Sequence, residues 1–182
     1  MKLDRTFRFR GRRDYLHSAS LFDDILKIRG ADATHIDLKF HQRTAQQVSY
    51  TDRLPAGREP VAEWWDARGK LYVVAREEPI ADTEPYDEPT LARMLWIDGK
   101  TVFVPEATPG FSRIEAIIAG FKRLMQETRP TDKQYVFVRV RLERLPEGAM
   151  QVRYTRDIGD FFQGDILADG RLAGQVFFGE WA

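Results

Sequence analysis

The stretch RRDYLHSASLFDDIL, residues 12–26, gathers acid and base side chains at the start of an expected helix. His17 lies within it, and imidazole is the side chain that titrates near neutral pH without special surroundings. Asp14 precedes His17 by three residues, so its carboxylate could orient the imidazole or act alone. Asp23 follows on the same expected helix. The stretch is therefore a candidate for general acid–base chemistry, and a polar loop with a hydrogen-bonded histidine is the alternative.

Two serine–carboxylate pairs have a spacing that also has a purely structural use. Ser20 precedes Asp23 by three residues, and Ser112 precedes Glu115 by three. In a capping box of this spacing, the serine and the carboxylate satisfy backbone N–H groups at a helix start. A carboxylate partly buried near a helix start can also be tuned as a general base. Both interpretations stay open for Asp23 and Glu115.

Apolar spacing predicts the helices that must position these groups. Apolar residues recur at helical intervals over 21–28, and the glycine of RGAD at 29–32 predicts the end of that helix. A longer amphipathic helix is predicted over 111–125, with a stop at the Arg-Pro pair of 129–130.

Alternating strands are predicted before and after each helix. FRFRG at 7–11 and TVFVP at 101–105 precede the helices, while THIDLKFHQR at 34–43 and YVFVRVRL at 135–142 follow them. In the last of these, one face is predicted to pack on the helix and to carry Val136, Val138, Val140 and Leu142, with Phe137, Arg139 and Arg141 on the other face.

The order of elements repeats along the chain. QQVSYTDR at 46–53 and MQVRYTRD at 150–157 share QV-x-YT, 104 positions apart (47 and 151). ARGKLYVVAR at 67–76 and ADGRLAGQVF at 168–177 match 101 positions apart (69 and 170). Ordered matches at a nearly constant offset predict a duplication. Two unrelated runs of hairpins are the alternative.

Domain boundaries follow from the repeat. The Pro-rich, acidic segment EEPIADTEPYDEPT has linker chemistry and lies between the two candidate units. We expect a first unit over 1–80, a linker over 81–92 and a second unit over 93–182.

Composition restricts the classes of function. The 182 residues are 43% apolar and 31% charged, which is typical of a globular protein, and 28 basic side chains balance 28 acidic ones. This balance predicts no general attraction to nucleic acid or to an anionic membrane. The chain has no cysteine and starts with charged residues, so we expect a cytoplasmic protein without disulfides or a membrane span.

The order of a strand, a long apolar helix and antiparallel strands resembles the hot-dog fold. The resemblance implies an α+β protein, a double hot-dog of two tandem units, each with a long central helix wrapped by an antiparallel sheet. PGFSRIEAII at 109–118 resembles P-G-x-x-x-[IL]-[ED]-A of bacterial 3-hydroxyacyl carrier-protein dehydratases. This match implies a catalytic role for Glu115 and a substrate-binding role for Gly110. The family has Gln four residues after the acid and His about fourteen before it, where this chain has Ala119 and Thr101.

The first half can supply the missing histidine if the two halves combine, since double hot-dog dehydratases take His and acid from different halves. His17 is then the partner of Glu115, and alignment of LFDDIL with RIEAII makes Asp23 the counterpart of Glu115. DYLHS also resembles, without its glycine, the D-x-x-G-H pattern of hot-dog thioesterases related to the 4-hydroxybenzoyl-CoA enzyme, which implies roles for Asp14 and His17.

The substrate expected from the resemblance is an acyl thioester, free or on an acyl carrier protein. Arg10, Arg12 and Arg13 of FRFRGRR are candidates for holding the phosphates of coenzyme A or phosphopantetheine, and an exposed strand edge is the alternative. Trp64 and Trp65 could line an acyl tunnel, although only one of two adjacent strand residues can face the core.

No metal site and no cofactor of the protein's own are expected. His35 and His41 lie on the polar side of their strand, and a whole helix separates them from His17. The functions expected are 3-hydroxyacyl dehydration, thioester hydrolysis, or acyl or protein binding by a module without catalysis. A homo-oligomer is compatible with all three.

Overall fold

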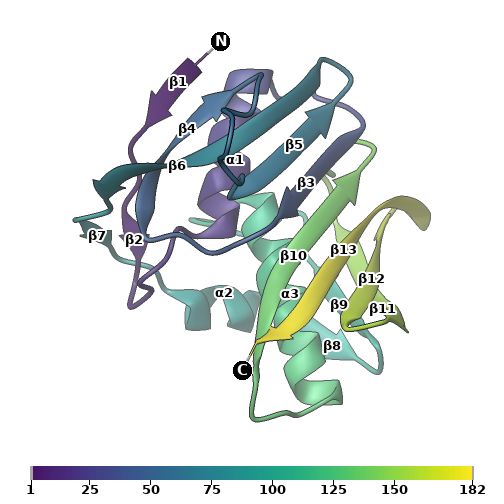
Figure 1. Ribbon diagram of the computed structural model, residues 1–182. Coiled ribbons are helices and arrows are strands. Elements are labelled where there is room, and N and C mark those ends of the chain that lie inside the picture. Colours follow the sequence, from purple (N-terminus) through teal and green to yellow (C-terminus); the bar gives the residue numbers. More distant parts are fainter. Residues whose placement is uncertain (1, 182) are drawn as a thin grey trace. The chain divides into compact units, whose positions relative to one another are not determined.

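The computed structural model describes residues 2–181, and the chain divides into two compact units, Met1–Asp87 and Glu88–Ala182 (Figure 1). The boundary falls inside the segment 81–92, for which we expected a linker. That segment contributes β7 (Thr83–Glu84) to the first unit and the start of α2 (Glu88–Met94) to the second. Within residues 2–181 no helix combines the length and apolar character that a membrane crossing requires.

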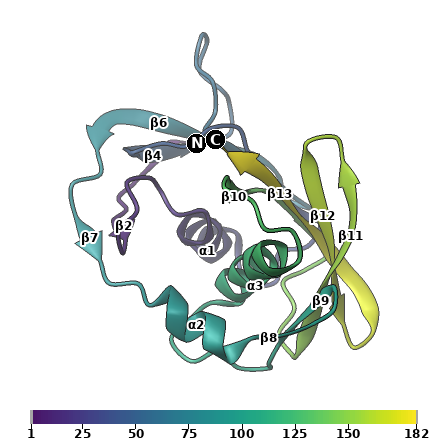
Figure 2. The same ribbon diagram turned by 90° about the horizontal axis from the view of Figure 1, so that it is seen from below.

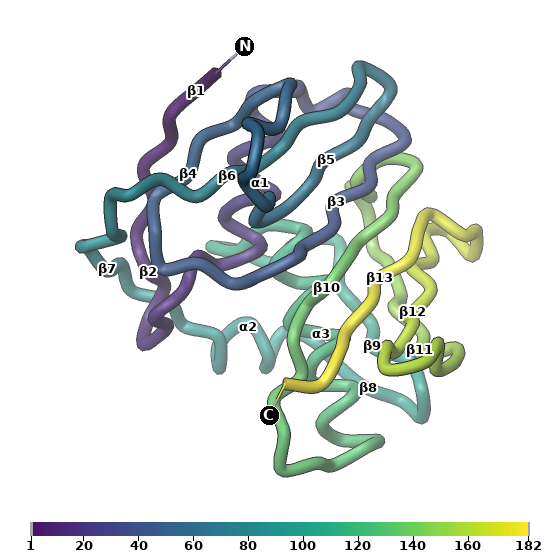
Figure 3. Tube along the Cα trace, viewed as in Figure 1, coloured from purple at the N-terminus to yellow at the C-terminus, as the bar shows by residue number. Residues whose placement is uncertain are grey.

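The first unit packs one long helix against an antiparallel sheet. Besides β7, this unit contains β1 (Lys2–Arg5), β2 (Phe9–Arg10), the long helix α1 (Ser18–Arg29), β3 (Ile36–Phe40), β4 (Gln46–Thr51), β5 (Ala62–Asp66) and β6 (Gly69–Pro79). The strand order is β1-β4-β6-β5-β3, with each neighbouring pair antiparallel. β3 and β4 are consecutive in the sequence but are separated in the sheet by β5 and β6. The connection between them can be followed in the trace of Figure 3.

The core of the first unit forms where α1 faces the sheet, and Figure 2 shows this helix end-on beside β4 and β6. Phe22 of α1 and Trp64 of β5 are fully buried, with their ring centroids 5.2 Å apart. Trp65 is 47% exposed on the opposite face, so only one of the two tryptophans faces the core, as alternation predicts. Gly30, at a φ of 94°, ends α1 as predicted.

The FRFRG segment does not form the first strand of the sheet. β1 at Lys2–Arg5 takes that place, and only Phe9 and Arg10 form β2, which pairs in parallel with β7 outside the main sheet. Gly11, at a φ of 61°, turns the chain directly afterwards, which limits β2 to two residues.

The second unit also consists of a long helix packed on an antiparallel sheet. After α2 it contains β8 (Trp96–Asp98), β9 (Thr101–Val104), α3 (Arg113–Thr128), β10 (Gln134–Leu142), β11 (Met150–Ile158), β12 (Phe161–Ala168) and β13 (Arg171–Trp181). The strand order is β10-β13-β12-β11-β9-β8, antiparallel throughout. The predicted α+β class, with helices packed on antiparallel strands, is confirmed.

α3 lies close to the sheet because one strand residue has no side chain. Phe121 of α3 is fully buried, and a Cβ on Gly164 of β12 would lie 2.5 Å from its ring. The predicted stop of this helix is confirmed, since α3 ends at Thr128 before Arg129 and Pro130.

A β-bulge overturns part of the predicted facing of β10. The register with β13 shifts between Phe137 and Arg139. Val140 and Leu142 are buried as predicted, but Phe137 packs edge-on against the buried Phe178, so it shares their face. The predicted facing of Phe137, and with it that of Val136 and Val138, is wrong, because an inserted residue reverses the alternation of side chains.

The two repeated sequence motifs occupy the sheets differently. QV-x-YT falls on β4 and β11, and each of these strands pairs with a main-sheet strand from before the long helix, β1 or β9. The second match falls on β6 and β13. β6 lies between β4 and β5, whereas β13 lies between β10 and β12. β5 and β6 thus have the opposite spatial order to β12 and β13. The duplication stays a prediction.

Close approach of neighbouring strands makes Gly174 of β13 sensitive to substitution. A Cβ there would lie 2.1 Å from the carbonyl oxygen of Arg141 and 2.8 Å from the Leu142 side chain. Because a backbone oxygen cannot move aside, we expect Gly174→Ala to lower the free energy of unfolding by about 3 kcal/mol in urea denaturation. Gly148→Ala is the matched control, since no atom lies within 4 Å of its Cβ position. Equal stability of the two variants would contradict the register of β10 and β13.

Candidate functional site

Glu115 is a buried carboxylate in the first turn of α3, only 3% exposed. The N–H of Ser112, the N-cap residue, donates to Glu115 Oε2 at 2.6 Å, and the Ser112 hydroxyl accepts from the N–H of Glu115 at 3.3 Å. Of the two interpretations left open for this pair, the capping box is observed. It holds the carboxylate in one orientation at a helix end that favours negative charge. Capping and acid–base chemistry thus make use of the same fixed group.

Arg113 anchors the loop that leads into this helix. Its Nη1 donates to the carbonyls of Pro105 and Glu106 at 2.8 and 3.2 Å, and its other nitrogens reach the carbonyls of Pro146 and Gly148. Burial lowers the pKa of this guanidinium. The cation therefore ties the β9–α3 loop to the β10–β11 turn and so holds the first turn of α3 in place.

Gly110 has a conformational reason to be a glycine. It adopts a φ of 83° within a turn in which the N–H of Phe111 donates to the carbonyl of Thr108 at 2.9 Å. A side chain would strain this left-handed conformation. The turn brings the chain into α3 three residues before Arg113.

His17 is the N-cap residue of α1 and is 6% exposed. Its side chain makes no capping hydrogen bond, and its ring centroid lies 5.2 Å from that of Tyr86. Because α1 begins at Ser18, Ser20 lies inside the first turn, and the capping-box interpretation of Ser20 and Asp23 is wrong. Counted from the two N-caps, Ser20 holds the position in α1 that Glu115 holds in α3. This differs from the expected pairing of Asp23 with Glu115.

Two of the three candidate arginines gather around Tyr86. The guanidinium of Arg13 lies 4.8 Å and that of Arg10 5.4 Å from the centroid of the Tyr86 ring. Arg10 Nε is also ion-paired with Glu84 at 3.0 Å. The structure therefore brings His17, Arg10 and Arg13 together on one tyrosine, which the sequence analysis did not single out.

The remaining candidates are Arg12, Asp14, Asp23 and Glu115. Arg12 and Asp14 are exposed, and neither forms an ion pair within residues 2–181. Asp23 is half-buried in the second turn of α1. His17 and Asp23 belong to the first unit and Glu115 to the second. Over the described part of the chain, no group of three His, Asp or Glu side chains is arranged to hold a metal ion.

Asp24, next to Asp23, is a firmly held carboxylate of α1. Arg5 of β1 binds both of its oxygens, with Nε 2.8 Å from Oδ2, and the Tyr50 hydroxyl donates to Oδ2 at 2.7 Å. Tyr50 is fully buried, and this burial, together with the Asp24 charge, raises its pKa far above the ordinary range. The cluster joins α1 to β1 and β4.

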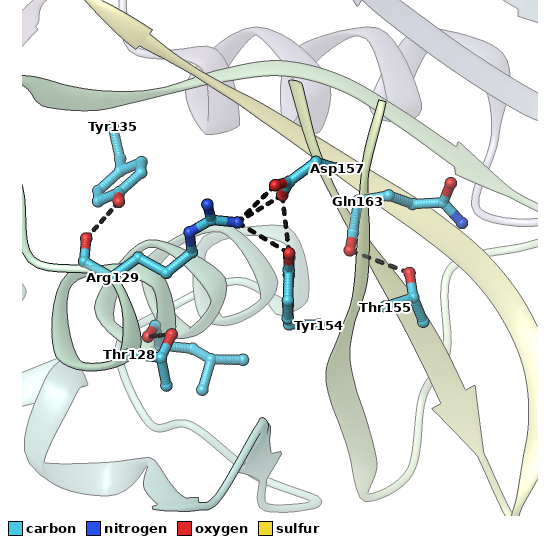
Figure 4. A network of polar contacts seen from close by, with 8 residues as sticks. Thr128, Arg129, Tyr135, Tyr154, Thr155, Asp157 and Gln163 are labelled. Atoms are coloured by element: carbon cyan, nitrogen blue, oxygen red, sulfur yellow. Dashed lines mark hydrogen bonds and ion pairs between the residues drawn. The ribbon is translucent and has the colours of Figure 1, made fainter. Parts of the chain in front are cut away.

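A comparable cluster closes the other end of α3 (Figure 4). Arg129 Nη1 lies 2.5 and 2.8 Å from the carboxylate oxygens of Asp157, and the Tyr154 hydroxyl donates to Asp157 at 2.7 Å. The Tyr135 hydroxyl donates to the carbonyl of Arg129. Arg129 follows Glu115 by fourteen residues, so the two ends of the helix are about 21 Å apart. This network anchors the helix at the end far from Glu115.

The tyrosines of both clusters, Tyr50 and Tyr154, come from the repeated QV-x-YT motif. The repeated motif could therefore have identified these two tyrosines from the sequence. No local pattern marks Tyr86, whose partners lie about 70 residues earlier in the chain.

Comparison with known proteins gives structural matches only. No family model matches the chain, and no curated protein matches it. The tesB protein of Mycobacterium avium subspecies paratuberculosis aligns with 100% of this chain and 93% of its own, at 10% identity and a TM-score of 0.51. A candidate thioesterase II from Thermobifida fusca YX aligns over 94% and 89% of the two chains, at 12% identity and a TM-score of 0.48. The dehydratase domain of RzxB from Pseudomonas fluorescens aligns over 97% and 96%, at 14% identity and a TM-score of 0.44. The first match carries the fold similarity, and the hot-dog fold expected from the sequence is confirmed.

The buried Tyr50 gives the first unit a specific dependence on alkaline pH. The pKa of Tyr50 is raised in the folded state from its ordinary value of 10.0, so above that pH the unfolded chain loses the proton while the folded chain keeps it. Stability is then fully present below pH 10 and falls as the pH rises. We expect the difference in unfolding free energy between wild type and Tyr50→Phe to shrink by about 1.4 kcal/mol per pH unit above pH 10. Urea denaturation from pH 7 to 11 measures it, and a constant difference over that range would contradict the burial of the hydroxyl.

Proposed function

We propose that this protein is a double hot-dog enzyme that processes acyl thioesters, with dehydration of a 3-hydroxyacyl thioester as its reaction. The observation that carries the proposal is the buried, oriented carboxylate of Glu115 in the first turn of a helix packed on an antiparallel sheet. This is the position that the dehydratase-like stretch PGFSRIEAII assigns to the catalytic acid.

Dehydration needs a base at C2 of the acyl chain and an acid at the C3 hydroxyl. In the proposed reaction His17 takes the C2 proton, the electron pair of that C–H bond forms the C2–C3 double bond, and Glu115 protonates the hydroxyl, which leaves as water. The ring of His17 packs on Tyr86, which restrains the orientation of the imidazole. The pairing of His17 with Glu115 is what the resemblance to double dehydratases implies.

The carrier of the acyl group is proposed to be coenzyme A or the phosphopantetheine of an acyl carrier protein in the cytoplasm. Arg10 and Arg13 are the candidates for its phosphates, since both guanidinium groups lie against Tyr86 near the start of α1. Arg12 is exposed and is the weaker candidate.

Thioester hydrolysis is the second candidate, and one feature favours it. The second unit contains no histidine, and Thr101 stands where the dehydratase motif has one. A carboxylate alone can activate water against a thioester carbonyl, so Glu115, Asp23 or Asp14 would suffice for this reaction.

Glu115→Gln separates the two uses of this residue. Glutamine keeps the capping geometry, so we expect a stability close to wild type but a rate at least about 100-fold lower, since the acid–base group is lost. The assay incubates purified protein with acyl-CoA and 3-hydroxyacyl-CoA thioesters, and it detects free thiol for hydrolysis and enoyl absorbance for dehydration.

Two matched variants serve as controls. Ser112→Ala removes the cap and should lower the unfolding free energy by about 1 kcal/mol while largely keeping the rate. Glu106→Gln alters an exposed carboxylate in the preceding loop and should change neither. Turnover that persists in Glu115→Gln would refute the role of Glu115, and binding without turnover in the wild type would leave the non-catalytic module as the function.

A further inference from the structure

The last residues of the first unit lie on its arginine-rich segment. Residues 82–87 (DTEPYD), which we call the acidic strap, carry three carboxylates and no basic group, whereas residues 8–13 (RFRGRR) carry four arginines and no acid. β7 and β2 lie within these two segments and pair in parallel (Figure 1). Two N–H groups of the arginine-rich segment donate to carbonyls of the strap at 2.9 Å, Phe9 to Asp82 and Gly11 to Glu84.

The side chains of the strap occupy the arginines. Glu84 Oε1 lies 3.0 Å from Arg10 Nε. The guanidinium groups of Arg13 and Arg10 lie 4.8 and 5.4 Å from the centroid of the Tyr86 ring. A carboxylate and a phosphate use the same N–H donors of a guanidinium group, because both present oxygen acceptors to its planar fork. Glu84 therefore takes up donors that a phosphate bound to Arg10 would use.

Few bonds hold the strap in this position. β2 and β7 contain two residues each and form a separate sheet. Pro85 has no N–H group to continue the ladder, and Gly11 turns the other segment away at a φ of 61°. The side chains of Arg10 and Glu84 are 22% and 39% exposed, and ion pairs this open to solvent add little to stability.

A fixed point precedes the strap. Ile80 is 5% exposed, and its N–H donates to the carbonyl of Ala45 at 2.9 Å. β6 ends at Pro79, so the main sheet of the unit ends before this anchor. Opening of the strap therefore leaves the main sheet intact, which is the condition for a local opening of low free energy.

We propose that the acidic strap is an autoinhibitory segment, which covers Arg10 and Arg13 until a phosphate of the substrate displaces Glu84. The inference rests on the proposed function, since the phosphate is that of coenzyme A or of phosphopantetheine. One anion replaces another, and no covalent bond changes. The affinity for the substrate is reduced by the fraction of molecules in which the strap is open. Removal of the Glu84 charge should then tighten binding, whereas loss of a residue that supports the site would weaken it.

Glu84→Gln tests this competition by titration calorimetry with two probes, coenzyme A and 4′-phosphopantetheine. We expect the variant to bind about three- to fivefold more tightly than the wild type, because a neutral amide is a poorer partner for Arg10. A gain with both probes assigns the displaced position to the phosphate next to pantetheine, and a gain with coenzyme A alone assigns it to the phosphates of the nucleotide.

Glu78→Gln is the matched control. It removes the same charge from the same acidic stretch of sequence, but Glu78 is ion-paired with Arg76 on β6 and lies outside the strap. We expect this variant to bind both probes like the wild type. The comparison separates competition at Arg10 from a general change in the charge of the unit.

A disulfide lock gives a second test that does not depend on charge. Phe9 and Thr83 are register partners in β2 and β7, and the chain has no cysteine of its own. Neighbouring strands lie about 5 Å apart, within the Cα separation that a disulfide spans. The double variant Phe9→Cys, Thr83→Cys should bind coenzyme A at least about tenfold more weakly when oxidised than when reduced.

Three results would overturn the inference: unchanged or weaker binding of both probes by Glu84→Gln, an equal gain in Glu78→Gln, or equal affinities of the oxidised and reduced double variant. Turnover of acyl thioesters combined with any of these results would refute the strap alone. Failure of the wild type and of Glu84→Gln to bind either probe would count against the proposed function, because Arg10 and Arg13 would then not form a phosphate site.

Discussion

A helix packed against a sheet has backbone N–H groups at its start that water does not reach, and each must find an acceptor. In α3 the acceptors are the side chains of Ser112 and Glu115, and the buried position of that carboxylate follows from this need. The anchoring of the preceding loop by Arg113 serves the same turn, because a cap works only when the chain enters the helix at a fixed angle. The candidate acid of the site is thus a consequence of how the helix is buried.

Local patterns predicted the features that depend on local chemistry. The apolar period of α3, its stop at Arg129 and the Ser112 capping box are all encoded within a few residues, and all three are observed. The bulge in β10 is not local, because it depends on the register with β13, and it reversed the expected facing of Phe137. The start of α1 was missed for a similar reason: His17 is a poor cap by type, but its ring packs on Tyr86 from the far end of the unit.

The site shows the same division between local and distant information. Glu115 and His17 were identified as candidates from motif and residue type, whereas Tyr86 and Asp24 were not, since their partners lie far away in sequence. Asp23 and Asp24 are adjacent and chemically identical, and the binding of Asp24 by Arg5 and Tyr50 cannot be read from the local sequence. Arginine and tyrosine hold an aspartate in both units. The Asp24 side chain is 15% exposed and that of Asp157 is 45% exposed, so solvent screens the second ion pair more.

The different strand orders of the two units have a consequence for the order of assembly. In the second unit β11, β12 and β13 pair with their neighbours in sequence, so successive hairpins can form as each strand becomes available. In the first unit β4 pairs with β6, which follows β5 in the sequence. The edge of β4 that faces β6 therefore stays unpaired until β6, the last long strand of the unit, has been synthesised. Contacts between sequence neighbours form quickly, and contacts across long loops form slowly. A growing chain thus holds β4 with one edge unpaired for the time needed to synthesise roughly 20 residues, at about 5–20 residues per second.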